Sequence, residues 1–273
     1  TTKWARVLDG VGANLFYYSG ETRSPELPSG RQVGTREMEM AHFLNAEVIR
    51  LTDKIFMEGG LTMTERREAY NRIFEIKDMI KKDLEEYIAR NGIRYIVAEN
   101  ILAFPGNISL SLALLETARE KDLKIIAHSH DFWWERRRFR DHLQEAFQKE
   151  VEEIVPAGDN VITVVINHLQ KAALAEKKGI HNALVAPNVM DFENPPVADA
   201  RRSRQFREYF GIKDGERFFL APVRPVPRKE LKRTVDICQA AYEADPAHRI
   251  VKLVVTHPDG DEGRQYWKDI KEY

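Results

Sequence analysis

A basic loop in the last third of the chain has residue types suited to binding an anion. It begins at Arg224, passes through Lys229 and ends at Arg233, between an apolar run at 218–223 and an amphipathic run at 234–242. This order predicts a buried strand, a loop and the first turns of a helix. Backbone N–H groups, the helix dipole and basic side chains would converge there, and arginine offers a planar fork that suits phosphate. A solvated basic turn fits the same residues.

A second candidate stretch begins at two histidines. His128 and His130 are two residues apart, and Asp131 follows the second. On an extended chain the two imidazoles share a face, so with Asp131 they could bind a metal ion. The sequence specifies no further ligand, and short pairs of this kind are usually incidental, so we predict no metal site. A histidine beside an aspartate can instead act as a general base or orient a sugar hydroxyl.

Aromatic and basic residues follow these histidines. Trp133 and Trp134 could stack on a sugar ring, or they could pack beneath the loop, which is the commoner fate of tryptophan. Arginines stand at positions 136, 137, 138 and 140. They could hold an anionic group of an acceptor, whereas a solvated helix start would account for at least two of the four.

The composition argues against several classes of protein. The 273 residues carry a net charge of -1, from 42 basic and 43 acidic side chains, which disfavours a dominant nucleic-acid or membrane-surface role. The single Cys238 excludes an internal disulfide and a cysteine-based zinc site, and it favours a reducing compartment, which we take to be the cytoplasm. We find no membrane-spanning run, no signal peptide and no Walker A, Gly-x-Gly-x-x-Gly or Gly-x-Ser-x-Gly sequence.

The hydrophobic pattern predicts alternating strands and helices. We expect strands at 14–18, 93–98, 123–127, 161–166, 183–186, 218–223 and 250–256. We expect helices at 1–8, 35–58, 64–90, 107–120, 139–151, 168–178, 201–210, after 229 and from about 262. Strands separated by helices predict an α/β protein with a mostly parallel sheet. The proline-bearing segment 194–197 predicts a boundary between a domain at 1–193 and another at 194–273.

Functional-looking residues follow the predicted strands. In open α/β sheets, ligands bind where the strands end. Asn100 follows one strand, the two histidines follow the next, and Asn188 and His257 follow two others. Their recurrence at the same end of each strand favours a binding site at that edge of the sheet.

Three of these places together resemble the GT-B glycosyltransferases, specifically the large retaining family 4. The segment from Arg224 to Lys229 resembles the family's R-x-x-x-x-K-G loop, with Glu230 in the position of the glycine. The segment 187–191, Pro-Asn-Val-Met-Asp, is similar to the family's P-N-G-V-D without its glycine. The sequence from His128 through Asp131 is similar to the family's acceptor-side histidine segment, and the H-D-F-W-W-E-R string resembles a subgroup. The strand before His257 stands where the family has a strand ending in T-G, so the match covers roughly residues 90–260.

The resemblance implies a GT-B-like α/β fold of two Rossmann-like parallel-sheet domains that face each other across a cleft. The first domain would bind an acceptor and the second a nucleoside-diphosphate sugar. In such a fold a first strand and a Gly-rich loop would precede Thr1, and an E-x7-E segment would lie beyond Tyr273. The second domain is therefore expected to be truncated in this sequence.

The resemblance also assigns roles to residues. Arg224 and Lys229 would hold the donor's diphosphate and stabilise the leaving group, and His257 would contact the donor. His130 would have a catalytic role and would contact the acceptor or the donor sugar near the reacting carbon. Asn100, Asp131 and Arg136 would contact the acceptor. No cofactor and no metal is implied. The acceptor would be a sugar or another small or lipid-linked molecule, and peripheral contact with a membrane is compatible with this.

The sequence therefore predicts transfer of a hexose from a nucleotide sugar with retention of anomeric configuration. Two alternatives stay open. One is a GT-B-fold epimerase or phosphorylase, which product analysis would separate from a transferase. The other is a non-catalytic module that binds nucleotide sugars without turnover.

Overall fold

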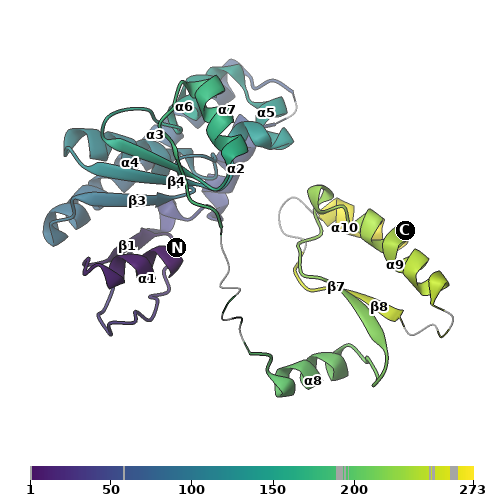
Figure 1. The fold of residues 1–273 in the computed structure, drawn as a ribbon. Coiled ribbons are helices and arrows are strands. Elements are labelled where there is room, and N and C mark those ends of the chain that lie inside the picture. The colour runs from purple at the N-terminus through teal and green to yellow at the C-terminus, as the bar shows by residue number, and fades with distance from the viewer. Residues whose placement is uncertain are drawn as a thin grey trace. The chain divides into compact units, whose positions relative to one another are not determined.

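The chain forms two compact units, which are Thr1–Val189 and Met190–Tyr273 (Figure 1). The computed structural model describes residues 2–57, 59–188, 193, 195, 197–245, 247, 250–258 and 264–273. The predicted domain boundary at 194–197 lies just beyond this division, and residues 194 and 196 are outside the described ones. Both units are of the predicted α/β class with parallel strands.

A four-stranded parallel sheet forms the centre of the first unit. Its strands are β3 (Tyr95–Glu99), β4 (Lys124–Ser129), β5 (Val161–Val165) and β6 (Leu184–Val185), in that order. Helices connect them: α4 (Ile108–Glu120), then α5 (Arg137–His142) with α6 (Gln148–Glu153), then α7 (His168–Lys178). Because all four strands run the same way, their carboxyl ends meet at one edge of the sheet.

A small two-stranded sheet and the helices α1 to α3 also belong to this unit. Helix α1 (Thr2–Gly10) precedes β1 (Phe16–Ser19), which pairs in parallel with β2 (Gly34–Glu37). The long helix α3 (Met63–Asn91) begins in a capping box between Thr62 and Glu65 and ends at Gly92, whose φ is 61°. Its apolar face is buried against α4 and the neighbouring strands and consists of Ile73, Ile76, Ile80, Leu84 and Ile88. None of the helices in the described part of the chain is long and apolar enough to cross a membrane.

The predicted helix at 35–58 is wrong over its first part. Residues Gly34–Glu37 pair with β1 instead, and α2 spans only Ala46–Ile55. The side chain of Asn45 accepts hydrogen bonds from the backbone N–H groups of Glu47 and Val48, which sets the start of the helix. The helical spacing of apolar residues continues on the N-terminal side of the cap at Asn45, into residues that form β2. This spacing therefore placed the start of the helix too early.

The predicted helix at 139–151 is also wrong as a single helix. Helix α5 ends at His142, and the chain is extended at Leu143 and Gln144 before a 3-10 turn leads into α6. The backbone N–H of Gln144 donates to the carbonyl of Ile55 at 2.9 Å, and its side-chain amide donates to the carbonyls of Met57 and Gly59. These tertiary hydrogen bonds replace the helical ones.

The second unit contains a parallel strand pair between helices. Helix α8 (Ala200–Tyr209) precedes β7 (Arg217–Ala221), and α9 (Leu231–Ala244) precedes β8 (Ile250–Val255) and α10 (Arg264–Glu272). Strands β7 and β8 pair in parallel. The basic loop follows β7 and precedes α9, as the sequence predicted.

Replacing Asn107 with alanine should lower the free energy of unfolding by about 1–3 kcal/mol. Its buried side chain caps α4 by accepting from the N–H of Leu110 and also donates to the carbonyl of Met40 at 2.8 Å. Urea denaturation followed by circular dichroism measures the change. Thr62→Ala, at the exposed cap of α3, is the reference and should cost about 1 kcal/mol. A stability for Asn107→Ala equal to that of the wild type would contradict the capping role.

Candidate functional site

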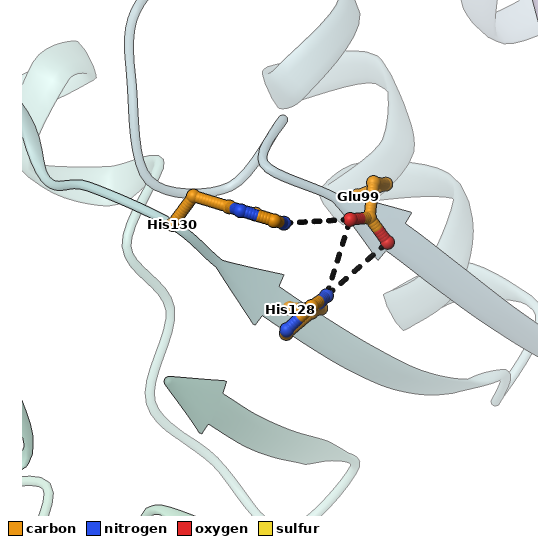
Figure 2. A group of neighbouring side chains, drawn as sticks. All are labelled: Glu99, His128 and His130. Atoms are coloured by element: carbon orange, nitrogen blue, oxygen red, sulfur yellow. Dashed lines mark hydrogen bonds and ion pairs between the residues drawn. The ribbon is translucent and has the colours of Figure 1, made fainter. Parts of the chain in front are cut away.

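Three side chains meet at the carboxyl edge of the first unit's sheet (Figure 2). Glu99 at the end of β3 is the register partner of His128 on β4, and His130 follows two residues later. Register partners and residues two apart lie on the same face of a sheet. An oxygen of Glu99 lies 2.7 Å from Nε2 of His130 and 3.2 Å from Nδ1 of His128. The cluster is partly open, because the side chains of His128, Glu99 and His130 are 8%, 21% and 33% exposed.

The imidazole of His128 faces two groups with opposite demands. Nδ1 lies 2.9 Å from the indole nitrogen of Trp4 in α1 and 3.2 Å from both carboxylate oxygens of Glu99. The indole N–H needs a lone pair on Nδ1, whereas the carboxylate needs a proton there. One ring nitrogen cannot supply both. The other nitrogen, Nε2, is buried and has no hydrogen-bond partner among the described residues.

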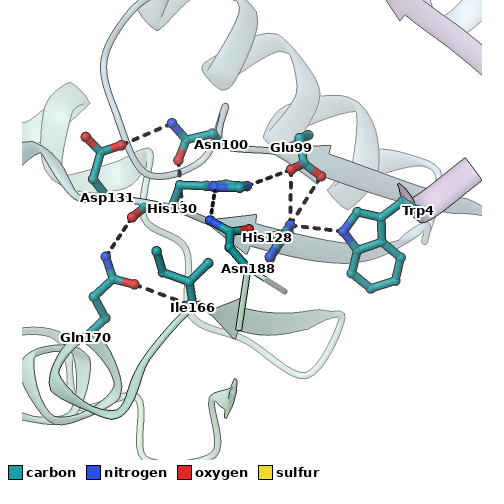
Figure 3. Close-up of polar contacts among 9 residues, drawn as sticks. All are labelled: Trp4, Glu99, Asn100, His128, His130, Asp131, Ile166, Gln170 and Asn188. Carbon is teal, nitrogen blue, oxygen red and sulfur yellow. Dashed lines mark hydrogen bonds and ion pairs between the residues drawn. The ribbon is translucent and has the colours of Figure 1, made fainter. Parts of the chain in front are cut away.

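The imidazole of His130 is held from both sides. Nε2 faces Glu99, and Nδ1 lies 3.2 Å from the side-chain amide nitrogen of Asn188. When the amide of Asn188 donates to Nδ1, the proton of the neutral ring is on Nε2 and is donated to Glu99. The contacts with Glu99 and Asn188 together fix the orientation of the His130 ring, which is the most exposed of the three side chains (Figure 3).

Asn100 and Gln170 hold the chain where it leaves β4 (Figure 3). Asn100 has a left-handed backbone with φ of 59°, a conformation that asparagine adopts more readily than most residues. Its side-chain oxygen accepts from the N–H of His130 at 2.9 Å, and its amide donates to Asp131 at 3.2 Å. Gln170 in α7 donates to the carbonyl of His130 at 2.8 Å. The peptide groups on both sides of His130 are thus fixed by side chains from two other segments.

The acidic and basic neighbours of His130 are paired with each other. Asp131 accepts from Nε of Arg136 at 2.5 Å, and the guanidinium of Arg136 lies 4.4 Å from the ring centre of Phe104. Arg138 pairs with Asp53. The structure therefore brings together the four predicted acceptor residues, which are Asn100, His130, Asp131 and Arg136.

The two tryptophans take the packing role that the sequence left open. Trp134 is buried and stacks on Phe132 with ring centres 4.6 Å apart. Trp133 is partly buried and packs against apolar side chains of the core.

Glu99 is ionised more readily than an ordinary glutamate. Burial raises the pKa of its carboxyl group, but hydrogen bonds from His130 and His128 outweigh this, and the pKa lies below its ordinary value. In turn, burial and the charge of Glu99 raise the pKa of Tyr17. The cluster therefore presents a carboxylate to two imidazoles.

The second unit carries the other predicted site residues. Arg224 and Lys229 lie on the exposed loop after β7, and His257 follows β8, where Nδ1 lies 2.9 Å from the hydroxyl of Thr256. Because β7 and β8 are parallel neighbours, the segments with Arg224 and His257 leave from the same edge. Glu230, which stands where the resembling family has glycine, has a φ of 50°. The left-handed backbone that favours glycine is therefore kept here with a glutamate. Of the 187–191 motif, residues 189–191 lie outside the described residues.

Sequence reasoning missed the residue at the centre of the cluster. Glu99 directly follows the strand predicted at 93–98 and precedes Asn100, but it is not among the predicted site residues. The register that sets Glu99 opposite His128 is a tertiary feature with no local sequence signal. Trp4 contacts His128 across 124 positions and was equally hidden.

Comparison with known proteins gives two similar sequences. A protein of Thermotoga maritima named mannosylglucosylglycerate synthase is 30% identical over 295 aligned positions, which cover 99% of this chain and 62% of that protein. A protein of the same name from Petrotoga mobilis is 26% identical over 169 residues, covering 62% of this chain and 36% of that protein. The chain thus matches less than two thirds of the length of these curated relatives. No protein-family model matches the chain.

Among solved structures, Arabidopsis thaliana UGT89C1 complexed with UDP aligns with 97% of this chain and 59% of its own. The TM-score is 0.41 and the identity 11%. A likeness at that level supports no inference about this chain.

The stability advantage of wild type over Glu99→Gln should shrink as the pH falls below 4.5, the ordinary pKa of the group. Because the folded-state pKa is lower than the unfolded one, ionised Glu99 favours folding above that pH, and this contribution is lost as the pH falls through the folded-state pKa. The titratable groups that act on it include His128, His130, Tyr17 and the positive charge of the chain's N-terminus. Urea midpoints of both proteins, measured from neutral pH to about pH 3, test this, and a constant difference across the range would contradict it.

Proposed function

We propose that this chain is the acceptor-binding unit and part of the donor-binding unit of a glycosyltransferase. The enzyme would move a hexose from a nucleoside-diphosphate sugar to an acceptor with retention of anomeric configuration. The observation that carries the proposal is the similarity to the Thermotoga maritima synthase across 99% of this chain. The two-domain GT-B arrangement that the motifs resemble is part of the same proposal.

The name of the relatives supports a class of acceptor. Mannosylglucosylglycerate contains two hexoses and a glycerate, so its synthesis requires transfer of a sugar to a small hydroxylated acid or its glycoside. We propose an acceptor of this class, with a carboxylate, for the first unit. The Asn100 and Asp131 side chains near His130 provide polar groups that can contact sugar hydroxyl groups. Arg136, which pairs with Asp131, supplies the guanidinium of the predicted acceptor set.

The basic loop of the second unit supports the donor role. Negative charge grows on the departing diphosphate as the glycosidic bond breaks, and cations placed before the reaction stabilise it. Lys229 immediately precedes the turn into α9, whose first N–H groups add to the same positive field. Arg224 and Lys229 would therefore act on the leaving group, and His257 would contact the donor.

Arg224→Ala and Lys229→Ala should each weaken nucleoside-diphosphate binding by roughly 10- to 150-fold, the equivalent of losing one charge-assisted hydrogen bond of about 1.5–3 kcal/mol. Calorimetry with UDP, GDP and ADP measures the change and identifies the base. Wild type saturated at 100 times Kd should gain about 2.7 kcal/mol of apparent stability. Arg228→Ala, in the same exposed loop, is the matched control and should bind like wild type. Binding by all three variants at the wild-type level would refute the donor-site assignment.

Arg136→Glu and Arg138→Glu should raise the KM for a carboxylate-bearing acceptor and leave the KM for the nucleotide sugar unchanged. The reason is that a reversed charge repels the acceptor's anion at the unit where it binds. Arg67→Glu, on the exposed surface of α3, controls for the change in net charge. Initial-rate kinetics with varied acceptor gives the answer, and an unchanged acceptor KM in both variants would discard the anionic acceptor.

A further inference from the structure

We propose that Glu99, His128 and His130 form a binding site for a divalent transition-metal ion. The described residues contain these three potential ligands with their coordinating atoms within 4.8 Å of one another (Figure 2). The proposal does not depend on the glycosyltransferase assignment, because it concerns only the cluster in the first unit.

The spacing of the three groups is close to that of a coordination shell. Ligands at 2.0–2.1 Å from a tetrahedral zinc ion are separated by about 3.3 Å. The Glu99 carboxylate lies 3.2 Å from Nδ1 of His128 and 2.7 Å from Nε2 of His130. The coordinating atoms of all three residues lie within 4.8 Å of one another, so an ion placed between them could be reached by each.

The conflict at His128 is what an ion would resolve. With the Trp4 indole donating to Nδ1, the nitrogen's lone pair and the Glu99 carboxylate face each other at 3.2 Å with no proton between them. A cation in this position would be attracted to both. It would also compete with the Trp4 N–H for the lone pair, so Trp4 should oppose metal binding.

The outer contacts suit a metal-bound histidine. Such a histidine normally hydrogen-bonds through its other ring nitrogen, which sets the orientation of the ring. Nδ1 of His130 lies 3.2 Å from the side-chain amide of Asn188, and an asparagine amide can present either its N–H or its oxygen. When Nε2 of His130 binds an ion, the ring proton is on Nδ1, and the side-chain oxygen of Asn188 can accept a hydrogen bond from it.

The ligand set indicates the kind of ion. Two imidazoles and one carboxylate favour zinc, cobalt, nickel or iron over magnesium or calcium, which prefer all-oxygen shells. Three protein ligands leave at least one position for water or a substrate oxygen. The one-third exposed side chain of His130 provides an opening to solvent. The sequence alone did not indicate Glu99 as a ligand, because the β3–β4 register brings it to the histidines.

The test is a titration of the purified, tag-free protein with Co²⁺, followed by its visible absorption and by calorimetry, with Zn²⁺ as competitor. We expect one equivalent per chain, displaced by Zn²⁺. Glu99→Gln and His130→Ala should each weaken binding at least 10-fold, the lower bound seen even for outer-contact changes. Trp4→Phe should strengthen it. His181→Ala, an exposed histidine outside the cluster, should bind like wild type.

Thermal unfolding without metal shows which variants are folded. Glu99→Gln keeps the size of the side chain, and His130 is partly exposed, so both variants are expected to fold. If one of them does not fold, the other still tests the proposal. Failure of the folded wild type to bind saturably would overturn the proposal. So would wild-type affinity in a folded Glu99→Gln or His130→Ala protein, because the ion would then lie elsewhere.

Discussion

The parallel hydrogen bonding of β3 to β4 is the constraint on which the candidate site depends. It sets Glu99 directly opposite His128, and the alternation of side chains along β4 then returns His130 to the same face. A shift of one residue in this register would turn the two histidines away from the carboxylate. The register is in turn held by the apolar packing of α3 and α4 against these strands, which spans Leu84, Ile88, Ala98, Leu114 and Ile125. A polar cluster at the edge is therefore positioned by a hydrophobic core behind it.

Polar contacts then refine what the sheet has placed. Asn100 binds the N–H on one side of His130, and Gln170 binds the carbonyl on the other. Because a buried backbone group without a partner is costly, these contacts fix the path of the chain just past the strand. The helix-start residues Asn107 and Asn167 cap α4 and α7 in the same way. The edge of the sheet is thus stabilised largely by amide side chains that carry no charge.

Local patterns predicted the elements well where one segment decides its own structure. The helix α3, the helix α7 from His168 to Lys178 and the strands of the main sheet followed from the spacing of apolar residues. The predictions failed where distant groups decide. Residues 34–37 form a strand because they pair with β1. The helix predicted at 139–151 is interrupted at Gln144, whose side chain donates to the segment after α2. The candidate site divides in the same way. Asn100, His130, Asp131 and Arg136 were visible because each follows a strand in sequence, whereas Glu99 and Trp4 reach His128 through pairing and packing that local sequence does not encode.

The left-handed turn at Asn100 limits which residues that position can accept. Glycine would adopt the same backbone freely but would remove both the contact to the His130 N–H and the contact to Asp131. Aspartate could keep the acceptor but would place a second negative charge beside Asp131. Most other side chains would meet the steric cost of a positive φ, about 1–2 kcal/mol, without either contact. Position 100 therefore has two independent requirements, a left-handed backbone and a side chain that both accepts and donates hydrogen bonds. Asparagine meets both.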